Sequence, residues 1–225
     1  MSDRTTLSEK TAGFAQDSSG RLTPSDIDSC LDAAISRYSR HRPDEKTVDI
    51  SGSGEHDYDL PQGWLEGFSD IRQIEYPVDQ VPAMLLDDDD YELYRSVDGL
   101  KLRLISYAPA DDFRVTITVP RTDETVPGND IDAVSLLAAS LCLERLATRF
   151  VDTGDPIIQA DVVNYRTKSA EAAARAKQYA KLYKEHLGLK EDDNQPAASA
   201  VSSNEINYPG GGDRLTHPRR GRRLR

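Results

Sequence analysis

Three stretches of the chain repeat apolar residues at the spacing of an amphipathic helix. In the first, residues 23–42, Thr23 is a favourable N-cap and Pro24 suits the first helical position. Its apolar residues recur at intervals of three and four positions, at Ile27, Cys30, Leu31, Ala34, Ile35 and Tyr38. Arginines and a histidine then precede Pro43, where the pattern stops. The pattern predicts a helix over residues 23–42 with one apolar face.

The second stretch, residues 130–150, is richer in leucine and alanine and leaves little polar face. A helix that is apolar on most sides has to contact other elements on more than one side. We therefore expect this helix at the centre of the helical part.

The third stretch, residues 168–187, is rich in alanine and tyrosine. Ser169 can cap its start and Gly188 its end. Small residues let a neighbouring backbone approach closely, and tyrosine adds contact area with few rotatable bonds. We predict that this helix contacts another copy of the chain through Ala172, Ala176, Tyr179 and Tyr183.

Between the first two helices, residues 46–121 change to the alternating pattern of short strands, as in "DFRVTITVP". The glycines of "SGSG" (51–54) and the sequence "VDG" (97–99) are typical of hairpin turns. Several prolines punctuate the region and would disrupt a central strand. We predict one small antiparallel sheet of five or six strands, with one face packed on the helices.

The two ends of the chain lack such periodicity. Residues 1–22 are polar around an isolated Phe14 and predict a flexible arm, and residues 190–225 predict an extended tail. The predicted fold class is thus α+β, with a bundle of about three helices and an inserted sheet in one domain, residues 23–189.

The charge of the chain is uneven. The formal net charge is −11, which argues against an overall basic surface for nucleic acid. The C-terminal end is nevertheless basic, with Arg214, Arg219, Arg220, Arg222, Arg223 and Arg225. These arginines are candidates for docking a partner. Three interpretations remain open: contact with phosphates, docking to an acidic protein surface, or a solubilising end.

The polar residues carry no local signature of catalysis or metal binding. Asp87–Asp90 are consecutive carboxylates, typical of a solvated loop, and His41, His56, His186 and His217 lack the spacing of metal ligands. Cys30 and Cys142 lie among apolar residues and indicate buried thiols. We predict no enzymatic activity and no cofactor. No apolar run approaches the length of a membrane span, so we also expect no membrane partner.

Trp64 is the only tryptophan of the chain. It suits either an anchor of the core or sheet edge, or a contact residue at a protein interface, where aromatic residues are enriched.

Four segments, in their order along the chain, resemble head–tail connector (adaptor) proteins of tailed bacteriophages. They are "DIDSCLDAAISRYSRHRP", "YDLPQGWLEGFSDIRQIEYP", "DDYELY" and "NYRTKSAEAAARAKQYAKLYKEHLG", which together span about residues 26–188. The resemblance implies a structural protein of the virion neck, made in the host cytoplasm. It implies a ring of twelve copies that binds the portal protein on one side and a tail or neck completion protein on the other. It also implies a central channel through which DNA passes without sequence-specific contact.

Two other functions stay open at this point. The chain is also compatible with a tail-completion or stopper protein one ring lower in the neck. In a different class, it is compatible with a cytoplasmic regulatory module that binds nucleic acid through the arginine-rich tail.

Overall fold

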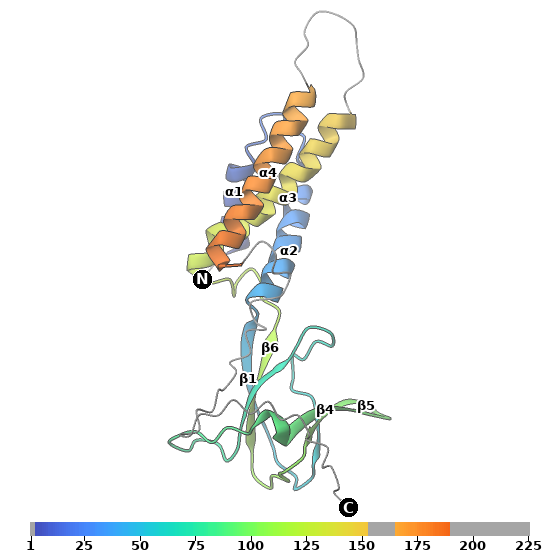
Figure 1. Cartoon of the computed structure of the whole chain (residues 1–225), viewed down its shortest axis with the longest axis vertical. Coiled ribbons are helices and arrows are strands. Elements are labelled where there is room, and N and C mark those ends of the chain that lie inside the picture. The colour runs from blue at the N-terminus through green and yellow to red at the C-terminus, as the bar shows by residue number, and fades with distance from the viewer. Residues whose placement is uncertain (1–2, 153–164, 190–225) are drawn as a thin grey trace, which may run out of the picture.

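The computed structural model describes residues 3–152 and 165–189. The chain is α+β, and its helices and strands form two parts (Figure 1). Within these two ranges, four helices make a bundle at one end, and six strands make a β module at the other. The long strands β1 (Asp44–Ile50) and β6 (Phe113–Val119) begin and end the β module where it joins the bundle.

Helix α1 spans Arg4–Ala15, so the prediction of a flexible arm over residues 1–22 is wrong for this segment. Asp3 caps the helix by accepting a hydrogen bond from the backbone N–H of Thr5. Leu7, Thr11 and Ala15 recur every fourth residue, and all three are buried. This narrow face packs against the bundle, which stabilises a helix whose remaining surface is polar.

Helix α2, Pro24–His41, confirms the first predicted helix. The Thr23 hydroxyl accepts a hydrogen bond from the backbone N–H of Asp26. In return, the Asp26 carboxylate accepts a hydrogen bond from the backbone N–H of Thr23. This capping box satisfies two backbone donors at the helix start. The predicted apolar stripe from Cys30 to Tyr38 is buried.

Helix α3, Ile131–Asp152, follows the short 3₁₀ helix η2, Gly128–Asp130. It contacts α1, α2 and α4, as its nearly continuous apolar surface predicts. Helix α4, Tyr165–Leu187, lies alongside α3 and begins before the predicted cap, so Ser169 lies inside it. The Ser169 hydroxyl donates instead to the carbonyl of Ala147 in α3. Gly188 ends α4 with φ +71°, as expected for a glycine C-cap.

The six strands form two antiparallel sheets, where one was predicted. The first sheet has the order β1–β6–β3 and the second β2–β5–β4. The remaining strands are β2 (Asp57–Asp59), β3 (Ile71–Glu75), β4 (Tyr91–Ser96) and β5 (Gly99–Leu104), and a 3₁₀ turn η1 (Asp88–Asp90) precedes β4.

The two sheets share a core of their own. Phe113, Val115 and Ile117 of β6 pack with Ile74 of β3 and Leu102 of β5. The buried residues of this cluster all come from the β module, so the predicted packing of one sheet face on the helices is wrong. The "VDG" turn does join β4 to β5 as a hairpin, but the "SGSG" segment leads from β1 in one sheet to β2 in the other.

Candidate functional site: an exposed apolar surface and two polar networks

The predicted contact residues of α4 lie against the chain itself. Ala172 and Ala176, which are 8% and 1% exposed, pack with residues of α3, and Tyr183, 2% exposed, belongs to the bundle core. The Tyr179 ring lies edge-to-face against Phe14 of α1, with 6.1 Å between centroids. Its hydroxyl donates to the Phe14 carbonyl. The prediction that these four residues contact another copy is therefore wrong for Ala172, Ala176 and Tyr183, which are buried within the chain. Tyr179 contacts α1 of the same chain.

Trp64 packs partly buried against the core of the β module. This placement agrees with the anchor interpretation. Within the described residues its indole Nε1 is buried and has no hydrogen-bond partner. The six candidate arginines, Arg214 to Arg225, lie outside the described residues.

A buried carboxylate joins three helices at the end of the bundle that faces the β module. Asp130 accepts hydrogen bonds from the Tyr38 hydroxyl at 2.5 Å and from Arg42 Nη1 at 3.0 Å. Its Oδ1 lies 2.7 Å from Nε2 of His186. The cluster connects the C-terminal ends of α2 and α4 to the start of α3. No local sequence pattern points to it, because its residues are up to 148 positions apart.

The electrostatics of this cluster favour an ionised Asp130. Burial opposes ionisation, but hydrogen bonds from Tyr38, His186 and Arg42 outweigh it and hold the pKa of Asp130 below its usual value. Burial, and then the contact with Asp130, raise the pKa of Tyr38. The Asp130 carboxylate and the Tyr38 hydroxyl therefore keep their pairing over the neutral range, which suits a structural role.

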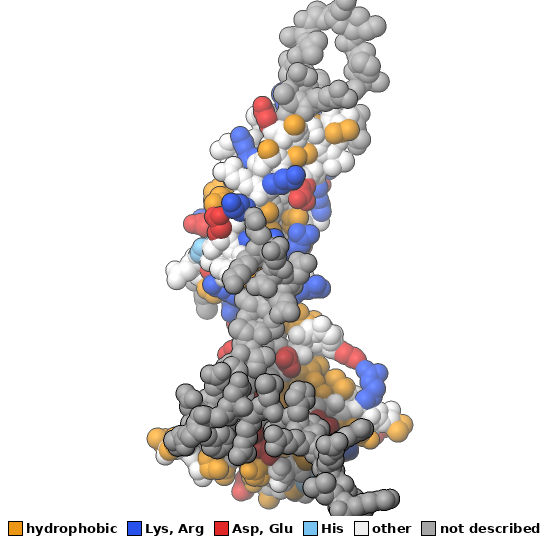
Figure 2. Space-filling model, viewed as in Figure 1, with side chains coloured by type: hydrophobic (Ala, Val, Ile, Leu, Met, Phe, Trp, Pro, Cys, Tyr) orange, Lys and Arg blue, Asp and Glu red, His pale blue; other side chains and the backbone are white. Residues whose placement is uncertain are grey.

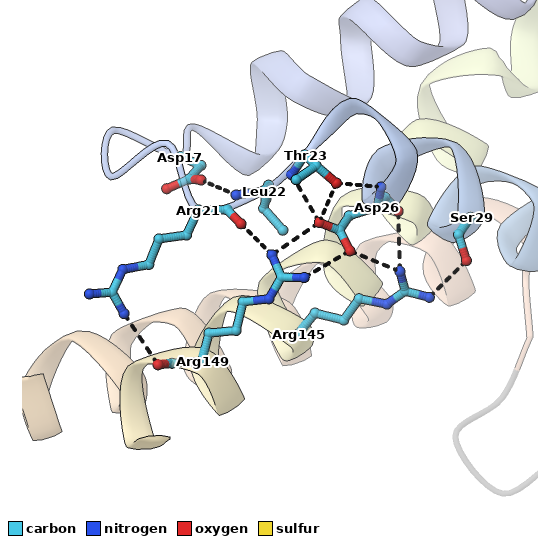
Figure 3. Close-up of polar contacts among 8 residues, drawn as sticks. All are labelled: Asp17, Arg21, Leu22, Thr23, Asp26, Ser29, Arg145 and Arg149. Atoms are coloured by element: carbon cyan, nitrogen blue, oxygen red, sulfur yellow. Dashed lines mark hydrogen bonds and ion pairs between the residues drawn. The ribbon is translucent and has the colours of Figure 1, made fainter. Parts of the chain in front are cut away.

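A second polar network fastens the connection between α1 and α2 to α3 (Figure 3). Arg149 holds both carboxylate oxygens of Asp26, at 2.9 and 3.0 Å. Arg145 donates to the Ser29 hydroxyl at 2.9 Å, and Arg21 donates to the backbone carbonyl of Arg149. The Arg149 guanidinium holds the pKa of Asp26 well below its usual range. The carboxylate thus serves both as a helix cap and as an anchor for α3.

Cys30 and Cys142 are buried free thiols, as predicted, and they lie together between α2 and α3. The neighbouring Cys30 thiol, together with burial, raises the pKa of Cys142. A buried thiol with a raised pKa is a poor nucleophile.

Within residues 3–152 and 165–189, no group of three or more His, Cys, Asp or Glu side chains is arranged to hold a metal ion. Asp88–Asp90 form the short turn η1, capped by Asp87. None of the helices in these ranges is long and apolar enough to span a membrane.

A hollow of about 560 Å³ lies where α2 meets the loop that contains Leu65 and Phe68. Its lining holds charges of both signs, and Arg4 already pairs with Asp32 at 2.8 Å. The hollow therefore favours no particular charge in a ligand.

Exposed large apolar side chains gather on the β module. Figure 2 shows hydrophobic side chains at the end of the β module remote from the bundle. Most of those that are exposed lie between residues 65 and 107: Leu65, Val81, Met84, Leu85, Leu93, Tyr94, Val97, Ile105 and Tyr107. Val151 and Leu182 are the two on the described part of the bundle. Clustered apolar side chains on a surface mark sites of protein contact.

Four of these residues and a half-buried neighbour form what we call the apolar patch, at the outer edge of β3. It comprises Tyr76, Val81, Met84, Leu85 and Tyr107. The rings of Tyr76 and Tyr107 lie 6.1 Å apart, and the Tyr76 N–H donates to the Met84 carbonyl. Leu85 forms a β-bridge with Glu75, the last residue of β3. The patch is therefore one surface, built from two loops held against the end of β3.

The β module also concentrates the negative charge. Residues 44–119 carry 18 Asp and Glu against six Lys and Arg, a formal net charge of −12, close to the −11 of the whole chain. The remaining residues are almost neutral in sum. An apolar surface on an acidic module is the interaction feature that this structure offers.

In comparisons with known proteins, the sequence matches no protein-family model and no curated protein.

Proposed function

We propose that this chain is a structural assembly protein, a head–tail connector of a tailed bacteriophage that forms a ring beneath the portal. The order of sequence segments described above supports the proposal. The observation that carries it in the structure is the concentration of exposed apolar side chains on the β module, away from the bundle core. Such a surface suits contact with another protein.

In this proposal the two parts of the chain have different tasks. The bundle forms the rigid body of the subunit, tied together by Asp130 and Asp26. The β module presents its apolar patch to a neighbouring protein of the neck. Because Ala172, Ala176 and Tyr183 are buried in the chain itself, contacts between copies have to use other surfaces. The arginine-rich tail binds the portal. The DNA in the channel passes a protein whose net charge is negative.

The proposal is tested by mixing the purified protein with the portal protein of the same phage and imaging the mixture by negative-stain electron microscopy. We expect rings coaxial with the portal. The double variant Met84→Gln/Leu85→Gln should lose ring attachment, whereas Val151→Gln, on the bundle, should retain it. Deletion of residues 213–225 should abolish portal binding while the protein stays folded.

Other outcomes would overturn the proposal in distinct ways. Attachment only to a portal that already carries another ring would identify a stopper protein. Binding to DNA that weakens steeply with salt, with no attachment to portal, would identify the nucleic-acid-binding alternative.

A further inference from the structure

We propose that the arginine-rich C-terminal segment, residues 213–225, binds the β module of its own chain at the apolar patch. Binding would mask both surfaces in the free protein. A role for this masking in virion assembly rests on the proposed function. The binding of the segment to the patch does not.

The first argument is the chemistry of the two surfaces. The segment "DRLTHPRRGRRLR" combines six arginines with Leu215 and Leu224. The patch combines exposed apolar side chains with carboxylates close to it in the sequence. Asp79 lies in the loop of Val81, where it pairs with Arg114, and Asp111 and Asp112 follow Tyr107 closely; all three are exposed. Leucines can cover Met84 and Leu85 while arginines meet carboxylates, which is the complementarity expected of a specific contact.

The second argument is where the described chain ends. Leu189 follows α4 and packs against the bundle core at the end that faces the β module (Figure 1). The 23 residues between Leu189 and Asp213 can span up to about 80 Å when fully extended. A seven-residue strand such as β6 is only about 23 Å long. The segment can therefore reach any face of the β module of the same chain.

The third argument is the charge distribution. The β module carries a formal charge of −12, whereas residues 122–189 carry ten acidic and eight basic residues. A cationic segment tethered at Leu189 is thus drawn to the β module in preference to the bundle. The two exposed apolar residues on the bundle, Val151 and Leu182, lie on helices α3 and α4 outside the β module, which makes them a matched control.

The test uses two full-length proteins and one peptide. In the first protein the sequence is unchanged, and in the second all six tail arginines are replaced by glutamine. The probe is a fluorescent peptide of residues 213–225, and binding is measured by anisotropy at low salt. We expect the peptide to bind the glutamine-tail protein about tenfold more tightly than the unchanged one, because the tethered tail competes for the patch. Circular dichroism and thermal melting should show both proteins equally folded.

Two further variants locate the site. In the glutamine-tail protein, Met84→Gln/Leu85→Gln should weaken peptide binding about tenfold. The matched substitutions Val151→Gln/Leu182→Gln should leave it unchanged. Equal affinity of the peptide for the unchanged and glutamine-tail proteins, or binding that ignores the patch substitutions, would overturn the inference. Neither result depends on portal binding, so failure here is distinguishable from failure of the proposed function.

Discussion

Nε2 of His186 lies 2.7 Å from Oδ1 of Asp130, and this contact ties the last turn of α4 to the start of α3. Asp130 is 3% exposed and receives hydrogen bonds from Tyr38 and Arg42 as well. One carboxylate therefore ties three helices together beside the β module. A buried acceptor with several donors is costly to remove, because each donor loses its partner.

Replacement of Asp130 by asparagine should lower the free energy of unfolding by about 1–3 kcal/mol, since the charged acceptor of Tyr38, Arg42 and His186 is lost. Urea denaturation at pH 7 measures the change. The control is Asp132→Asn, two residues away, whose carboxylate is exposed and pairs with Lys10. This exposed pair should contribute less than about 1 kcal/mol. Equal losses in the two variants would contradict the role assigned to Asp130.

His41 should make the protein less stable in mild acid. Burial, and then repulsion from Lys184, lower the pKa of His41 below its ordinary value of 6.5. The unfolded chain then binds a proton more readily than the folded one, so the His41 contribution to stability is present above pH 6.5 and lost as the pH falls below it. The free energy of unfolding should decrease from pH 7 to pH 5, and less so in His41→Gln.

The cause of this shift has its own measurement. An NMR titration of the His41 ring in Lys184→Gln should give a higher pKa than in the unchanged protein. A pH dependence of stability that is identical in His41→Gln would show that other groups produce it.

Leu7→Ala should test the packing of α1. The Leu7 side chain is fully buried in the bundle core, so its truncation leaves a cavity and should cost about 2–5 kcal/mol. Thr6→Ala, at an exposed position of the same helix, should change stability by less than about 0.5 kcal/mol. Thermal or urea unfolding of both variants decides between a packed helix and a free arm; a free arm would make both substitutions neutral.

Two glycine-to-alanine changes should have opposite effects. Gly13 lies exposed in α1 with open space around it, so alanine should stabilise the protein by about 0.5–1 kcal/mol. At Gly52, a Cβ would lie 2.2 Å from the carbonyl oxygen of Asp111, so alanine forces the backbone apart and should cost about 1–3 kcal/mol. Denaturation curves of the two variants should therefore move in opposite directions. A neutral Gly52→Ala would contradict the close approach of the two loops.

Much of the fold is predictable from neighbouring residues. The cap at Thr23, the stripe from Ile27 to Tyr38 and the stop at Gly188 predict α2 and the end of α4, because caps and periodicity depend on residues within one or two turns. The "VDG" hairpin follows for the same reason. Helix α1 was missed because its buried face holds only Leu7, Thr11 and Ala15, a pattern too sparse to stand out.

Only the tertiary structure decided which element each helix face and each strand packs against. The amphipathic face of α4 is visible in the sequence, but its burial against α3, and not against another copy, depends on how the bundle closes. Likewise β1 pairs with β6, nearly seventy residues away, and not with the strand after "SGSG". The Asp130 cluster and the apolar patch likewise form through contacts between residues far apart in the sequence. Local sequence determines which faces must be buried or capped. The hydrophobic effect is non-directional, so an apolar face gains similar free energy against any complementary surface. Only the packing of the whole chain therefore selects the surface that covers each face.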